Sequence, residues 1–393
     1  MNILKEREKI EENEGIIEKK KSKNRDKFWD IVKGIGIISI VIGHVTINDI
    51  KEFVYTYHLI IFFFVAAYFY NEKKYGDEPF KNVGQRIKST WTKYVFYAMI
   101  LILSHNLFVE YHFYEPQIVK YNNFNEIIVP LLNTITFKCS EMFGGALWFV
   151  PTLLITISLF GGIVYISRNF SKRACAKIKK NKEKIEKYIK YIFILILTIL
   201  FGILGVFLNE NQLSLSYHIH TSFLVIPICT LGYFTREYID KIKKIKRWYV
   251  LIPIMILSTE ILIYVIKQGM KIELSKEMII NGYMFYIVSF VGVCFCLSLA
   301  GIIEKIPIIK TIIELLGKHS FAIMALHFAC AKGVDVIYSK IIGETNPEVI
   351  SKWVTSYPEK LWILYVFIGC IIPLMFSMIL EKLKRIGEKN GEH

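Results

Sequence analysis

The first apolar segment of the chain carries two ionisable side chains whose spacing could serve chemistry. Lys33 and His44 are eleven residues apart in FWDIVKGIGIISIVIGHV, residues 28–45. On a helix of 3.6 residues per turn, this separation is three turns plus about 20°, so both side chains share one face, about 16 Å apart along the axis. Asp30 lies one turn before Lys33 on nearly the same stripe and would orient its ammonium group.

This spacing suits a long ligand that binds its phosphates at Lys33 and brings a reactive group near His44. Coenzyme A thioesters have such a shape. The alternative is structural: Lys33 extends its charge to the lipid headgroups, and His44 is a buried histidine without a chemical role. Both interpretations stay open on the spacing alone.

Other ionisable residues also interrupt apolar segments, where each costs several kcal/mol and is usually retained for a use. Lys332 and Asp335 are three residues apart and would neutralise each other on one helix face. His105 is interpreted as a hydrogen-bonded packing residue. Glu260 has no acid or base near it in the sequence, so its partner must come from another helix. The remaining members of this set are His58 and His327.

The elements that must position these residues are membrane helices. A soluble chain of 393 residues could not bury 53% hydrophobic residues including 15% aromatics. Apolar segments of about 20 residues recur, each long enough to cross a bilayer as a helix, and no alternating strand pattern competes. We expect an all-α integral membrane protein of about ten transmembrane helices, at 30–48, 53–71, 91–109, 146–167, 190–208, 218–235, 248–266, 283–303, 319–339 and 361–380.

The distribution of basic residues orients these helices. Of the 49 Lys and Arg residues, 38 fall on one side of the predicted membrane and 10 on the other, with Lys33 inside the first span. The basic side is cytoplasmic, so both termini are cytoplasmic. We therefore expect a charged tail (1–29), a membrane domain (30–380) and a second tail (381–393). The net charge of +15 reflects this topology and does not indicate nucleic-acid binding.

The N-terminal tail and the cysteine pattern argue against a cleaved signal peptide and against a disulfide-stabilised or metal-binding protein. The first 27 residues contain no apolar core, so they are no signal peptide, and the first span acts as an uncleaved anchor. The seven cysteines are scattered without a Cys-x-x-Cys pair, and only Cys139 lies on the predicted outer side. Neither a disulfide framework nor a metal site is indicated.

Five motifs in order resemble the membrane-bound acyltransferases of the acyltransferase-3 family, and within it the fucose 4-O-acetylase-like branch. The first is a basic residue, ten intervening residues and a histidine, matched by Lys33 and His44 with Asp30 and Gly34 beside them. The others are YHLIIFFFVAAYFY (57–70), GQRIKSTWTKY (84–94), LWFVPTLL (147–154) and GKHSFAIMALHF (317–328). The similarity extends from Phe28 to about residue 380.

Two positions depart from the family pattern. The second helix has Ala66 and Ala67 where relatives usually show Ser-Gly, and a full Arg-x-x-Arg motif is missing. Only Arg86 and Lys88 stand in its place. The missing Arg-x-x-Arg motif affects the expected binding of the acyl donor more than the expected transfer of the acyl group.

The resemblance implies an O-acyltransferase, most often an O-acetyltransferase, spanning the plasma membrane several times. It would move an acyl group from cytoplasmic acyl-CoA, with acetyl-CoA as co-substrate and no bound cofactor, to a hydroxyl of a cell-surface glycan or related acceptor on the other side. His44 would be catalytic, either as a general base or as a transient acyl carrier. A neutral imidazole, with a reference pKa of about 6.5, can accept a proton at neutral pH.

The resemblance also implies roles in substrate binding. Lys33, oriented by Asp30, would bind the CoA phosphates together with Arg86 and Lys88. A lysine ammonium acts as a point charge, whereas the planar arginine guanidinium can donate two parallel hydrogen bonds. The cavity between them and the histidine would be lined by Trp148, Ser320 and His327.

The competing class is a transporter or flippase of a glycan or small metabolite, because many helices and charges at mid-membrane also describe secondary carriers. The sequence shows no inverted repeat and no pair of broken helices in corresponding halves. A structural or sensing membrane protein is a third class. Turnover of acyl-CoA separates the enzyme from both.

The charge distribution makes a topology prediction. Single cysteines placed near Asn122 or Gln268 should react with a membrane-impermeant maleimide in intact cells, whereas those near Asn181 or Lys243 should react only after permeabilisation. Cys139 is replaced by serine in every variant, because it lies on the predicted outer side. Labelling of the second pair in intact cells would contradict the predicted topology.

Overall fold

The computed structural model describes residues 26–242, 247–276, 278–279 and 281–390. This part of the chain is mostly α-helical with almost no strand, which confirms the predicted all-α membrane protein. A short antiparallel hairpin pairs β1 (Ile272–Glu273) with β2 (Met278–Ile279). The predicted tail up to residue 25, the last three residues and the labelling position Lys243 lie outside the described residues.

Eight segments of the described chain are long and apolar enough to cross a membrane. Each has at least 18 residues, which is about 27 Å of helix. They are α2 (Lys27–Val45), the pair α3 (Asn48–Tyr55) and α4 (Ile60–Tyr68), η1 (Met142–Gly144) with α9 (Phe149–Ala174), α10 (Lys182–Glu210), α12 (Trp248–Lys267), α13 (Gly282–Ile303), α15 (Ser320–Ile342) and α17 (Pro358–Asn390).

The other two predicted spans are helical, but they are not among the segments long and apolar enough to cross a membrane. The span 218–235 lies on α11 (Ile219–Ile242), and 91–109 lies on α6 (Pro79–Leu103) and α7 (His105–Glu110). The span 91–109 is therefore not one helix, because α6 ends before Ser104. The remaining short helices are α5 (Glu72–Tyr75), α8 (Phe124–Ile135), η2 (Ser216–His218), η4 (Leu274–Lys276), α14 (Pro307–Lys318) and α16 (Pro347–Ile350).

The predicted span 53–71 is also interrupted, by a turn at residues 56–59 between α3 and α4. In this turn the Thr56 hydroxyl donates to the Phe53 carbonyl at 2.7 Å. The His58 Nδ1 lies 3.0 Å from the Val54 carbonyl. Side chains that bond to nearby carbonyls satisfy backbone groups that a continuous helix would pair by itself.

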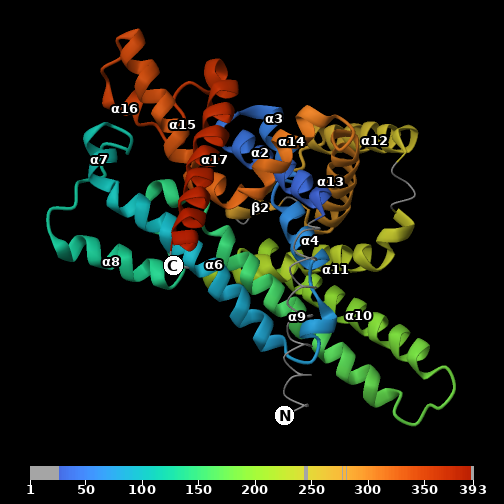
Figure 1. Cartoon of the computed structure of the whole chain (residues 1–393). Helices are drawn as coiled ribbons and strands as arrows, with labels where there is room; N and C mark the ends of the chain where they lie inside the picture. The colour runs from blue at the N-terminus through green and yellow to red at the C-terminus, as the bar shows by residue number, and fades with distance from the viewer. Residues whose placement is uncertain (1–25, 243–246, 277, 280, 391–393) are drawn as a thin grey trace.

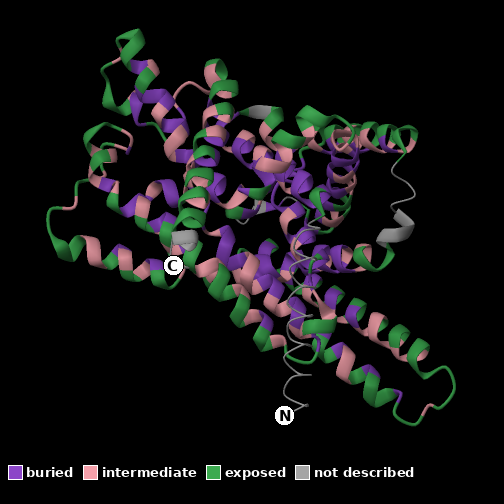
Figure 2. Ribbon diagram, in the orientation of Figure 1, coloured by how far each residue is buried: buried purple, intermediate pink, exposed green. Residues whose placement is uncertain are grey.

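Helix α2 lies at the centre of the molecule and packs against α14, α3, α4, α13, α15 and α17. In the most apolar 18-residue stretch of α2, 78% of the residues are buried, against 28% in the corresponding stretches of α10 and α17. Figure 2 shows the buried residues gathered around α2, α4 and α13, with exposed residues along the outer faces of α10 and α17. The hairpin of α9 and α10 projects from this body (Figure 1). The apolar side chains on these outer faces would contact lipid.

The contact between α2 and α14 is a backbone contact. A Cβ atom added at Gly317 would lie 1.8 Å from the Asp30 carbonyl oxygen, and one at Gly34 would lie 2.1 Å from the Ile313 carbonyl oxygen. Small residues permit such close approach of two helices in a membrane protein. The first turns of α2, which carry Asp30 and Lys33, are thereby held against α14.

Lys332 and Asp335 form the predicted ion pair and are fully buried. The ammonium lies 2.7 Å from the Asp335 carboxylate and donates to the main-chain carbonyl of Lys352 at 2.5 Å. Asp335 also accepts hydrogen bonds from the Ser356 amide, at 2.8 Å, and from the Tyr365 hydroxyl. This network fastens the segment after α16 to α15 and α17.

Two further sequence predictions have opposite outcomes. His105 is a hydrogen-bonded packing residue as predicted, with Nδ1 2.9 Å from Glu141 Oε2 and Nε2 2.9 Å from the Val119 carbonyl. The expected interhelical partner of Glu260 is absent from the described residues. Glu260 is exposed, because only 22% of α12 packs inside the chain.

The buried pair makes a stability prediction. Asp335→Asn should lower the free energy of unfolding by about 3–5 kcal/mol, because it leaves the Lys332 ammonium buried without a counter-charge. Glu78→Gln is the matched control, since Glu78 and Lys81 form an ion pair of the same sequence spacing at the surface, 2.9 Å apart. Its melting temperature in detergent should stay near that of the unchanged protein. Equal shifts in both variants would contradict a structural role for the buried pair.

Candidate active site

Helix α2 positions the three residues that the sequence singled out first. Asp26 caps the helix by accepting a hydrogen bond from the Phe28 amide at 3.2 Å. One turn later, the Lys33 ammonium lies 2.6 Å from the Asp30 carboxylate. Asp30 is buried and Lys33 half-buried, so the predicted orientation of Lys33 by Asp30 is confirmed. His44 is the last residue but one of the helix.

His44 lies among aromatic rings from α3 and α15. Its ring stacks on that of His327 with 5.3 Å between centroids and meets the ring of Phe328 edge-on at 4.8 Å. The Tyr55 ring lies 6.4 Å away. Within the described part of the chain, the His44 ring nitrogens make no hydrogen bond. His44 can therefore exchange a proton with a ligand without first breaking a bond within the protein.

The hydrogen bonds of His327 define its tautomer. Its Nδ1 lies 3.0 Å from the carbonyl oxygens of both Ile323 and Met324. Because carbonyl oxygens only accept, Nδ1 carries the proton, and Nε2 of the neutral ring presents a lone pair. This Nε2 is buried and makes no hydrogen bond among the described residues. His327 was predicted to line the cavity, but it is fully buried and lines neither of the two cavities described below; it contacts the site through its ring, which stacks on that of His44.

A small cavity, here called the outer cavity, opens beside His44. Its volume of about 20 Å³ is room for about one water molecule. It is lined by residues of α2, α3, α9, α15 and the β1 hairpin: Ile40, His44, Tyr55, His58, Leu59, Ala146, Trp148, Phe149, Glu273, Leu274, Ser275 and Met324. The sequence prediction identified Trp148 here, but missed Tyr55, Glu273 and Ser275, since no local pattern links the hairpin to α2.

A larger cavity of about 240 Å³, here called the inner cavity, shares Ile40 with the outer cavity. Its walls are mostly apolar and include the predicted residues Arg86 and Ser320. The full lining is Ile37, Ile40, Phe62, Arg86, Ser89, Thr90, Phe149, Val150, Leu153, Leu154, Ile157, Ser320, Phe321 and Met324. An apolar pocket with few polar groups is typical of a small-molecule or cofactor site.

The predicted cationic residues are placed differently from one another. Arg86 lines the inner cavity, and its Nε donates to the neutral Asn82 amide oxygen at 3.0 Å. Lys88, two residues later on α6, is exposed and lines neither cavity. Lys33 also lines neither cavity. Two residues along a helix are separated by about 200°, which turns Lys88 away from the side that Arg86 occupies.

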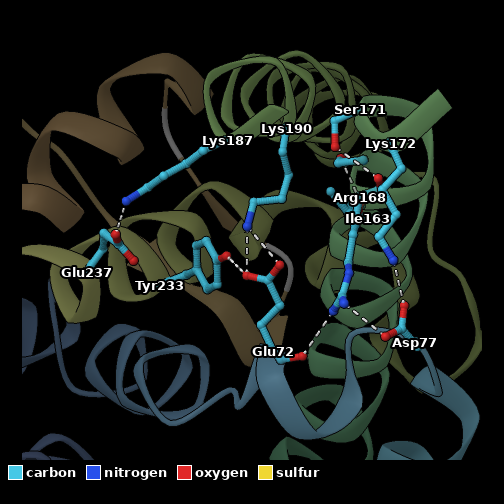
Figure 3. A network of polar contacts seen from close by, with 11 residues as sticks. Glu72, Asp77, Ile163, Arg168, Ser171, Lys172, Lys187, Lys190, Tyr233 and Glu237 are labelled. Atoms are coloured by element: carbon cyan, nitrogen blue, oxygen red, sulfur yellow. Dashed lines mark hydrogen bonds and ion pairs between the residues drawn. The ribbon is translucent and has the colours of Figure 1, made fainter. Parts of the chain in front are cut away.

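Several other cations are already paired with carboxylates (Figure 3). Glu72 of α5 accepts from the Lys190 ammonium at 2.7 Å and from the Tyr233 hydroxyl. Asp77 contacts Arg168 at 2.9 Å and Lys172 at 3.2 Å. These contacts join α5 to α9, α10 and α11. Arg86 has no carboxylate partner among the described residues, so its charge is available to an anionic ligand.

Fold and site together define a class: a multi-pass membrane protein whose central helix α2 presents a histidine to a small cavity, with a larger cavity adjoining it. The family model for the acyltransferase domain of the acyltransferase-3 family matches residues 26–382. The chain therefore belongs to this family and is a membrane acyltransferase. No curated protein and no solved structure matches it.

Proposed function

We propose that this acyltransferase moves an acyl group, preferably acetyl, from cytoplasmic acyl-CoA to a hydroxyl of a cell-surface glycan or related acceptor. It would act in the plasma membrane, as a member of the fucose 4-O-acetylase-like branch. One observation carries the proposal. His44 borders the outer cavity, while Arg86 borders the inner cavity, and the two cavities meet at shared side chains.

The inner cavity suits the donor. Arg86 offers an uncompensated guanidinium, which binds phosphate through paired hydrogen bonds, and the apolar walls beyond it suit the pantetheine arm and the acyl group. Ser320, on the wall formed by α15, can donate to a carbonyl of the donor. Lys33 is paired with Asp30 and lines neither cavity, so it would contact the phosphate end of the donor only outside the inner cavity, near the cytoplasmic end of α2.

The outer cavity suits a hydroxyl acceptor. Glu273, Tyr55 and Ser275 line it together with His44. A carboxylate accepts hydrogen bonds, and the two hydroxyl groups both donate and accept them. Adjacent hydroxyl groups of a sugar need this mixture of partners. A polyhydroxyl acceptor would therefore be held at the rim while one hydroxyl approaches His44.

In the base mechanism, the acceptor hydroxyl gives its proton to a His44 ring nitrogen while its oxygen bonds to the thioester carbonyl carbon. The carbon–sulfur bond of the tetrahedral intermediate then breaks. The CoA thiolate leaves and takes the proton back from the His44 imidazolium, so the products are the ester and CoA thiol. In the alternative, the His44 nitrogen itself carries the acyl group between the two partners. We favour the base role.

The first experiment tests His44. His44→Ala and His44→Gln should each reduce acetyl transfer by a factor of about 10²–10⁴, because neither side chain can accept the proton. Release of CoA thiol from acetyl-CoA is measured with methyl fucoside, galactoside and glucoside as acceptors, on the full chain in detergent. Melting temperatures should stay close to that of the unchanged protein. An active His44→Gln variant would end the catalytic assignment, and a transporter would release no thiol in any variant.

The second experiment tests the donor side with a matched pair on α6. Arg86→Ala should raise the KM for acetyl-CoA about tenfold or more, since a hydrogen bond to a charged group contributes about 1.5–3 kcal/mol. Lys88→Ala removes the same charge two residues away, outside the cavity, and should change KM less than about twofold. Equal effects would indicate that only the overall charge of this face matters.

A further inference from the structure

The inner and outer cavities share three lining residues, Ile40, Phe149 and Met324. They come from three separate helices, α2, α9 and α15. All three side chains are buried, at 2%, 5% and 6% exposure. We call these three residues the constriction. Because they line both cavities, they lie where the inner cavity adjoins the cavity beside His44.

The three members differ in how freely they can move. Ile40 is β-branched, and its side chain is restricted on a helix. Phe149 packs edge-on against the rings of Phe62, at 5.9 Å, and Phe63, at 5.2 Å. Met324 is unbranched, and its side chain adapts readily to the space around it. Met324 is therefore the member that can change the width of the passage.

Met324 is also connected to His44 through His327. Its main-chain carbonyl oxygen lies 3.0 Å from His327 Nδ1, and the His327 ring stacks on His44. Ile40 precedes His44 by four residues, and so by about one turn, on the same face of α2. Two of the three constriction residues, Ile40 and Met324, thus lie on the helices that carry His44 and its stacking partner His327, α2 and α15.

We propose that the constriction selects the acyl group by length, admitting acetyl and excluding longer chains. This inference rests on the proposed function. The inner cavity, at about 240 Å³, has room for an extended chain, whereas the outer cavity, at about 20 Å³, has not. A donor with a longer acyl group would bind in the inner cavity, but its thioester carbonyl carbon would stop before reaching the hydroxyl at His44.

The test compares acyl donors in the full chain. The unchanged protein should use acetyl-CoA about tenfold or more faster than butyryl-CoA, since a pocket that fits one size discriminates about 10- to 200-fold for each methylene. Met324→Ala removes most of the side chain and should reduce this ratio at least about tenfold by raising the butyryl rate. The same CoA thiol assay and methyl glycosides are used.

Two further variants make the result unambiguous. Met255→Ala is the matched control, because Met255 lies on α12 and lines neither cavity; its acetyl to butyryl ratio should not change. Phe149→Leu widens the same passage from another helix and should shift the ratio in the same direction as Met324→Ala. If the melting temperature shows that Met324→Ala does not fold, Phe149→Leu still tests whether the constriction selects the acyl group.

The outcomes separate this inference from the proposed function. Acetyl transfer with a ratio unchanged in both Met324→Ala and Phe149→Leu would overturn the constriction and leave the acyltransferase reaction in place. A preference of the unchanged protein for butyryl-CoA would do the same. If no donor is used by the unchanged protein, the proposed reaction fails, and the constriction fails with it.

Discussion

The structure depends on the burial of one helix. Helix α2 is surrounded by six others, and its first turns meet α14 backbone to backbone, where Gly34 and Gly317 leave no space for a Cβ atom. In a membrane, where lipid is as apolar as leucine, such close packing is what favours helix contact over lipid contact. Because α2 carries Asp30, Ile40 and His44, this packing positions both the site and the passage that leads to it.

The polar groups within the bundle divide into two kinds. Lys332 and Asp335 are completely buried and satisfied by each other and by neighbouring backbone, as the high energy of an unpaired charge in a low dielectric requires. His105 is likewise bonded at both ring nitrogens. His44, which is partly exposed, and the buried Nε2 of His327 differ, since neither has a hydrogen bond to the described residues. At His44, which lines the outer cavity, a ligand could supply the missing hydrogen bond.

Two cavities that meet at packed side chains reconcile two requirements on a membrane acyltransferase. In the proposed reaction, a donor and an acceptor from opposite sides would have to come within bonding distance without the protein becoming an open pore. The constriction of Ile40, Phe149 and Met324 meets both, because closely packed apolar side chains exclude water and ions while one flexible member can yield to a small group. Arg86, which has no carboxylate partner among the described residues, places a positive charge at the inner cavity and so gives the two cavities different chemistry.

By itself the sequence determined the helices, their number to within two, and the face that Lys33 and His44 share, because length, hydropathy and the 3.6-residue period are local properties of the chain. The same period related Lys332 to Asp335. Only the tertiary structure decided which helices meet, and so whether a residue such as Arg86 lines a cavity and which side chains, such as those of the β1 hairpin, approach His44. The physical reason is that nearly every face of a membrane helix is apolar. Hydropathy therefore does not distinguish a face against lipid from one against another helix, and that distinction arises from side-chain packing between segments far apart in the sequence.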